Sequence, residues 1–69
     1  MEIAWEDDAS ISASSTADTT VITANRAGLV SLARIMLALA DEMPGTHLHL
    51  DANNSLEDGS CELIIERVP

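Results

Sequence analysis

The most informative segment of the chain begins with His47-Leu48-His49-Leu50-Asp51 and ends with Glu62-Leu63-Ile64-Ile65-Glu66, at residues 47–51 and 62–66. Both runs place every second residue on the same side, which is the period of a β-strand. Residues 51–60 between them are rich in Asp, Asn, Ser and Gly, the residue types that form turns. The segment therefore predicts a hairpin of two strands joined by an acidic loop.

A single helix is predicted upstream of this hairpin, over residues 26–42. Apolar residues recur there at the 3-4-7 spacing of one helix face: Leu29, Leu32, Ala33, Met36, Leu39, Ala40 and Met43. Asn25 is a suitable N-cap, and Pro44-Gly45 is a suitable stop because the residue before Pro avoids the α region. Val30 and Leu37 form a second apolar pair on the flank. A helix with this many apolar residues is either covered by the sheet or leaves a patch for a partner, and we favour the covered arrangement.

The N-terminal third predicts two or three further strands. Residues 2–6 and 10–14 alternate in polarity, and residues 19–23 are rich in β-branched side chains. We therefore expect an α+β fold, a small two-layer domain spanning residues 1–69. Its antiparallel or mixed sheet of four to five strands would carry the helix on one face.

The core available to this domain is small. The chain has 69 residues, with no Phe or Tyr, and Trp5 is the only aromatic residue. A core of this kind supplies only about 3–5 kcal/mol, and small domains often gain stability from a partner. Binding to a larger protein or formation of a homodimer is therefore expected.

The charge is strongly unbalanced. Twelve Asp and Glu face only three Arg and no Lys, which gives a net charge of −9. Such a surface repels nucleic acid and anionic membranes, so neither is expected as a partner. It attracts a basic protein, because complementary potentials steer encounter. The alternative is that the charge serves solubility alone.

The sequence contains no recognisable targeting segment or disulfide framework. Cys61 is the only cysteine, and its place in the alternating pattern predicts a small buried apolar residue. The N-terminus lacks the basic and apolar regions of a signal peptide, and no apolar run is long enough to cross a membrane. A cytoplasmic protein is expected.

The side chains best suited to binding a metal or to catalysis are those of His47, His49 and Asp51. They share one face of the predicted strand, and a His-x-His pair can present two imidazoles to one metal, with Asp51 as a third ligand. No further His or Cys cluster supports this alternative. No nucleophile motif or phosphate-binding loop occurs either, so we predict a protein with neither enzymatic activity nor a cofactor.

A contact surface is the preferred interpretation of this hairpin. In its last strand Ile64 lies between Glu62 and Glu66 on the open face, an arrangement that suits a basic protein partner. The candidate partner-binding residues are His47, His49, Asp51, Glu57, Asp58, Glu62, Ile64 and Glu66.

A family resemblance agrees with this interpretation. It rests on Asn25-Arg26-Ala27-Gly28-Leu29, Leu32-Ala33, the run from Gly45 to Asp51, Leu56-Glu57, Gly59-Ser60 and the run from Glu62 to Arg67. Over residues 20–68 the chain resembles the bacterial immunity proteins of polymorphic toxin systems, in the group numbered 32. The His-x-His-x-Asp strand and the Leu-Glu-x-Gly-Ser turn are its most specific parts. Asn54-Ser55 departs from the family pattern, in which a Gly is expected.

The resemblance implies a small protein that binds and neutralises a cognate toxin in the producing cell. The net charge of −9 favours a basic toxin, and a nuclease is the toxin class that it suggests. Two alternatives remain. One is a metal-binding domain that uses His47, His49 and Asp51, and the other is an accessory module that oligomerises through Val30, Leu37 and the sheet edges.

Overall fold

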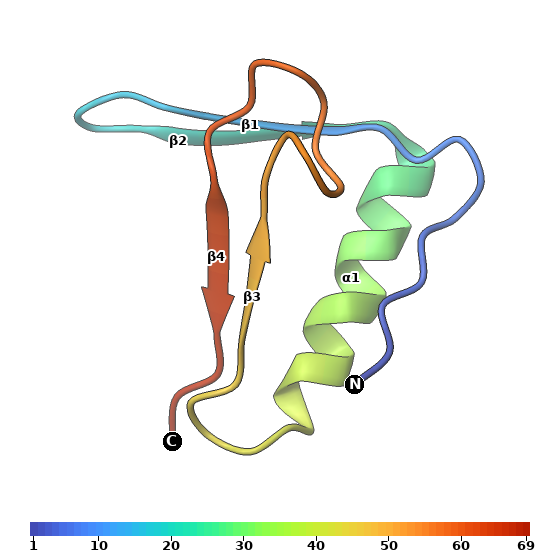
Figure 1. Cartoon of the computed structure of the whole chain (residues 1–69), viewed down its shortest axis with the longest axis vertical. Coiled ribbons are helices and arrows are strands. Elements are labelled where there is room, and N and C mark those ends of the chain that lie inside the picture. Colours follow the sequence, from blue (N-terminus) through green and yellow to red (C-terminus); the bar gives the residue numbers. More distant parts are fainter.

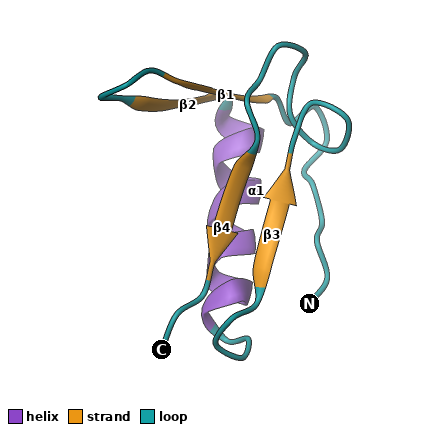
Figure 2. Ribbon diagram, turned by 60° about the vertical axis from the view of Figure 1, so that its left-hand side comes forward, coloured by secondary structure: helices purple, strands orange, loops and turns teal.

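The computed structural model describes residues 1–69 and has an α+β fold (Figure 1). Its elements, in chain order, are β1 (Ile11–Ser15), β2 (Thr20–Ala24), α1 (Arg26–Ala40), β3 (His47–Leu50) and β4 (Leu63–Glu66). The β3–β4 hairpin runs alongside α1, and the β1–β2 hairpin lies across the end at which α1 begins (Figures 1 and 2).

The predicted single sheet of four to five strands is wrong, because the four strands form two separate antiparallel pairs. In one pair Ile11 lies opposite Ala24, and in the other His47 lies opposite Glu66. The loop between β3 and β4 occupies the edge of β1 that another strand would need. The loop itself forms no regular strand, and within it Gly59 has φ +84°, a backbone conformation that favours glycine.

Hydrogen bonds hold this loop to β1. The Glu57 N–H donates to the Ile11 carbonyl at 2.8 Å, and the Cys61 N–H donates to the Ala13 carbonyl at 2.9 Å. The Ala13 N–H in turn donates to the Ser60 hydroxyl at 3.1 Å. The loop thus joins the two hairpins along the outer edge of β1.

The predicted strand at residues 2–6 is also absent, and this segment lies beside α1 instead (Figure 1). The Glu6 N–H donates to the fully buried Ser31 hydroxyl at 2.8 Å, and Arg34 pairs with the Glu6 carboxylate at 2.7 Å. Trp5 packs against the core. The helix thus supplies a hydrogen-bond partner for the Glu6 N–H in place of a neighbouring strand.

Helix α1 and its N-cap are confirmed. The Asn25 side-chain oxygen accepts from the Gly28 N–H at 2.8 Å and from the Ser10 N–H at 3.0 Å. The Asn25 amide also donates to the Asp8 carbonyl at 2.7 Å, so the capping residue ties the N-terminal segment to the helix. The helix ends at Ala40, two residues before the predicted end.

The buried face of α1 differs from the predicted stripe. Leu32 and Leu39 are buried as expected, but five other members of the stripe are exposed: Leu29, Ala33, Met36, Ala40 and Met43. The buried positions are Gly28, Ser31, Leu32, Ile35 and Leu39. The apolar spacing does not reveal this face, because two of its members, Gly28 and Ser31, do not count as apolar residues in such a pattern.

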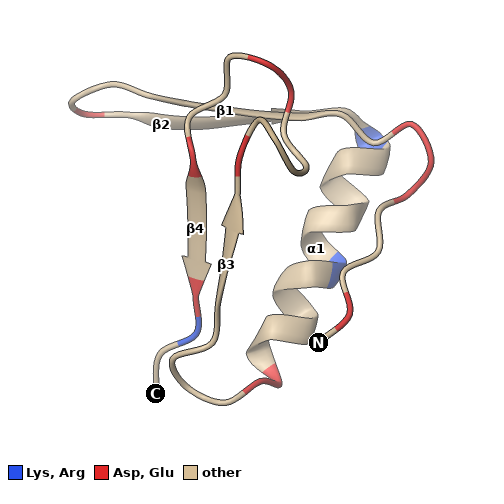
Figure 3. Ribbon diagram, in the orientation of Figure 1, with Lys and Arg blue, Asp and Glu red and all other residues tan.

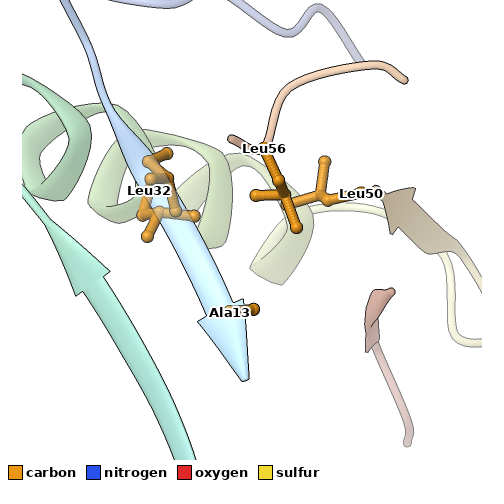
Figure 4. Packing of buried hydrophobic residues seen from close by; sticks show 5 residues of the cluster. Ala13, Leu32, Leu50 and Leu56 are labelled. Carbon is orange, nitrogen blue, oxygen red and sulfur yellow. The ribbon is translucent and has the colours of Figure 1, made fainter. Parts of the chain in front are cut away.

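The core collects residues from three elements, β1, α1 and β3, and from the loop. Its central cluster consists of Ile11, Ala13, Leu32, Leu50 and Leu56, and four of these are labelled in Figure 4. Cys61, a free thiol, is half-buried and packs against this cluster from the loop. Only 9 of 69 residues are buried, which agrees with the small core predicted from composition.

Gly28 allows α1 to approach β1 closely. A Cβ built at Gly28 would lie 2.6 Å from the Ser10 carbonyl oxygen and 2.8 Å from Cγ1 of Ile11. In an unobstructed helix, Gly→Ala would stabilise by about 1 kcal/mol. Here we predict that Gly28→Ala lowers the free energy of unfolding by about 1–3 kcal/mol, because the backbone must shift. Urea denaturation measures the difference.

Ala33→Gly is the matched control, since Ala33 is an exposed position of the same helix. It should cost about 1 kcal/mol, the ordinary difference between the two residues. Stabilisation by Gly28→Ala would contradict the close approach.

Candidate protein-binding surface

The β3–β4 hairpin has one face toward the core and one toward solvent, as the sequence predicted. Leu50 is buried, and Leu48, Leu63 and Ile65 are half-buried. The residues that alternate with them are exposed: His47, His49, Ile64 and Glu66. The strand register places His47 opposite Glu66 and His49 opposite Ile64, so that these four predicted residues form one surface.

The two imidazoles of this face are held in different ways. Nδ1 of His49 lies 3.1 Å from a carboxylate oxygen of Glu62, and Nδ1 of His47 lies 3.0 Å from the Gly45 carbonyl oxygen. The rings meet edge to face, with their centroids 5.0 Å apart. Glu62 is thereby linked to the outer face beside Ile64.

Asp51 has a structural role in the loop. Its carboxylate accepts a hydrogen bond from the Asn53 N–H at 2.9 Å, and its carbonyl accepts from the Asn54 and Leu56 N–H groups at 3.1 and 3.0 Å. The structure assembles no group of three His, Cys, Asp or Glu that could hold a metal ion. The predicted ligand set of His47, His49 and Asp51 is therefore not formed.

The Leu-Glu-x-Gly-Ser turn divides its residues between the core and the surface. Leu56 is 5% exposed and belongs to the central cluster, whereas Glu57 and Asp58 are exposed. Ser55, where a family Gly was expected, has φ +138°, a backbone conformation that favours glycine. The turn thus presents two carboxylates from a loop anchored in the core.

Few of the acidic residues are neutralised within the chain. Three carboxylates have a basic partner: Glu6 pairs with Arg34, Glu42 pairs with the N-terminal amine, and Glu62 lies 3.1 Å from Nδ1 of His49. The other nine have none, and acidic positions recur around both hairpins (Figure 3). On the β3–β4 hairpin and its loop, the carboxylates without an ion-pair partner are those of Asp51, Glu57, Asp58 and Glu66.

The guanidinium of Arg67, next to this surface, is directed at backbone oxygens. It donates to the carbonyl oxygens of Ala40, at 3.4 Å, and Val68. It therefore forms no ion pair with neighbouring Glu66, whose carboxylate stays available on the outer face.

A groove between α1 and β4 was not predicted as a site. It has a volume of about 200 Å³ and is lined by Met36, Leu39, Ala40, Ile65, Glu66 and Arg67. The signal for it was the surplus of apolar residues on the helix. Leu37 is 71% exposed, so the expectation that the sheet covers the apolar helix is wrong at Leu37.

Comparison with known proteins identifies one family. A family model described as Immunity protein 32 matches residues 19–68, from the start of β2 through the end of β4. No curated protein and no solved structure matches the chain. No helix in the structure has the length and apolar character needed to span a bilayer.

The exposure of the histidines makes a prediction about stability. The double substitution His47→Ala and His49→Ala should change the free energy of unfolding by less than about 1 kcal/mol, since both side chains are exposed and exposed polar contacts contribute little. Leu50→Ala, on the opposite face of the same strand, should cost about 2–5 kcal/mol. Thermal and urea unfolding of both variants test the assignment of faces, and a large loss in the histidine variant would contradict it.

Proposed function

Because the chain belongs to the immunity protein 32 family, we propose that it binds and neutralises a cognate bacterial toxin inside the producing cell. The family match over residues 19–68 is the observation that carries this proposal. The protein acts by occupying a surface of the toxin, so it needs affinity and fast association rather than an active site.

The outer face of the β3–β4 hairpin is the surface that we assign to toxin binding. Ile64, 51% exposed, provides an apolar centre. The polar groups around it are His47, His49, Glu62 and Glu66, with Glu57 and Asp58 extending the surface along the loop. An apolar centre within a polar rim is the usual organisation of a protein–protein interface.

The charge supports a basic toxin. With a net charge of −9 and most carboxylates unpaired, the protein would be steered toward a positive surface. A nuclease has such a surface in its nucleic-acid cleft, and carboxylates placed there would compete with phosphates. We therefore propose a nuclease as the toxin class.

The carboxylates of Glu62, just before β4, and of Glu66, at its end, provide a direct test. The toxin for this test is sought in the neighbouring reading frame, as the C-terminal domain of a large secreted multidomain protein. We predict that the double substitution Glu62→Gln and Glu66→Gln raises the Kd of the complex by about tenfold or more, since tenfold corresponds to about 1.4 kcal/mol. Isothermal titration calorimetry measures the Kd, and survival after toxin expression measures protection.

The matched control carries Glu2→Gln and Asp18→Asn, two unpaired carboxylates outside the β3–β4 hairpin. Both double variants change the net charge equally, so the control separates a local contact from general attraction. Equal effects in the two variants would contradict the assigned face. Failure of the wild-type protein to bind the toxin would overturn the proposed function itself.

A further inference from the structure

Strand β2 leaves one complete backbone edge unpaired. The Thr16 N–H donates to the Thr19 carbonyl at 2.8 Å, and the Asn25 N–H donates to the Ser10 carbonyl at 3.1 Å. The pairs Thr16–Thr19 and Ser10–Asn25 continue the β1–β2 register, and hydrogen-bonded pairs alternate along an antiparallel ladder. Val21 and Thr23, at the alternate positions between them, therefore also direct their backbone groups toward β1. The N–H and C=O groups of Thr20, Ile22 and Ala24 therefore point outward, and no hydrogen bond within the chain uses them.

This edge has none of the features that protect natural edge strands. Natural edges are blocked by Lys, Pro, bulges or a covering loop. Residues 20–24 contain no charge and no Pro, and their pairing with β1 is regular. The opposite edge of the β1–β2 hairpin differs, because the loop at residues 57–61 covers the outer edge of β1.

The β1–β2 hairpin is also the least charged part of an acidic protein. Residues 9–25 contain a single charged residue, Asp18. Two copies that each carry a charge of −9 repel one another over most of their surfaces. A neutral edge is the place where they can meet with least repulsion, whereas it offers no electrostatic attraction to a basic toxin.

The edge is complementary to itself. When two copies of β2 run antiparallel about a two-fold axis at Ile22, Ile22 pairs with Ile22 of the second copy, and Thr20 pairs with Ala24. Every residue in these pairs is one whose backbone groups point outward. The N–H and C=O groups of all three residues are thereby satisfied in one register.

The side chains benefit from the same arrangement. Ile22 and Val21 are 38% and 47% exposed, although both are β-branched residues suited to a sheet interior. Pairing brings the two Ile22 side chains together on the face that Ala13 shares. An isolated two-stranded sheet is marginal in water, and sheets of three or more strands are considerably more stable.

We propose that β2 is a dimer interface, at which two copies of this chain pair antiparallel along Thr20–Ala24 and merge their β1–β2 hairpins into one four-stranded sheet. The hairpin tip projects away from α1, and the β3–β4 hairpin is a separate element (Figures 1 and 2). The dimer thus leaves the outer face of β3–β4 free. This interface does not depend on the proposed toxin binding.

Sedimentation over a concentration series tests the dimer. The wild-type protein should reach twice the 7.3 kDa mass of one chain, and association should strengthen with added salt, which screens the repulsion. Toxin binding should respond to salt in the opposite direction. A wild-type protein that stays monomeric up to millimolar concentration would overturn the proposal.

Two matched substitutions distinguish the proposed dimer interface on β2 from the proposed toxin-binding face of the β3–β4 hairpin. Ile22→Lys and Ile64→Lys each replace an exposed isoleucine of a strand by a positively charged lysine. Ile22→Lys should raise the dimer dissociation constant by about tenfold or more and leave toxin binding unchanged, and Ile64→Lys should do the reverse. If Ile22→Lys fails to fold by circular dichroism, Thr20→Lys, at an exposed position of the same edge, replaces it.

A dimer that survives the edge substitution would overturn the proposal. So would a loss of toxin binding in Ile22→Lys, which would show that the edge receives a strand of the toxin instead of a second copy. Failure of Ile64→Lys to weaken toxin binding would count against the assigned toxin surface and leave the dimer result intact.

Discussion

The docking of the loop at residues 51–62 onto β1 is the interaction on which the rest of the structure depends. Leu56 enters the central cluster, and the N–H groups of Glu57 and Cys61 bond to carbonyls of β1. Without this loop the chain would consist of two hairpins of two strands each and one helix. Hairpins of that size are marginal alone, so the loop is what makes them parts of one core.

The same loop connects stability with the proposed function. Its apolar residue and its backbone face inward, while Glu57 and Asp58 stay exposed. Because the loop is bonded to β1 at Glu57, Ser60 and Cys61, the backbone that carries these carboxylates is anchored. A surface that is ordered before binding loses less entropy on association, which favours affinity in a small inhibitor. The Leu-Glu-x-Gly-Ser turn would therefore serve both the stability of the fold and the proposed toxin binding.

The sequence predicted the elements whose signals are local. The helix and its Asn25 cap, the strands of both hairpins and the division of β3 and β4 into two faces were all confirmed. The single sheet and the strand at residues 2–6 were wrong, because alternation identifies an extended segment but not its hydrogen-bonding partner. Ser31 provides that partner for Glu6, and a buried serine has no signature in an apolar pattern.

For the candidate surface, the alternation of β3 and β4 correctly grouped His47, His49, Ile64 and Glu66. It misplaced Asp51, whose carboxylate is used within the turn, because a strand period cannot show where the strand ends. The unpaired edge of β2 could not be predicted from the sequence either, since it depends on which sheet each strand joins.

Native-state hydrogen exchange of the Glu57 and Cys61 amides tests the central claim most directly. If loop docking holds the core together, both amides exchange only through the same opening as Ile35 in the buried face of α1, with an equal free energy. Rapid exchange of Glu57 and Cys61 while Ile35 stays protected would show that the loop opens on its own, and would contradict the account.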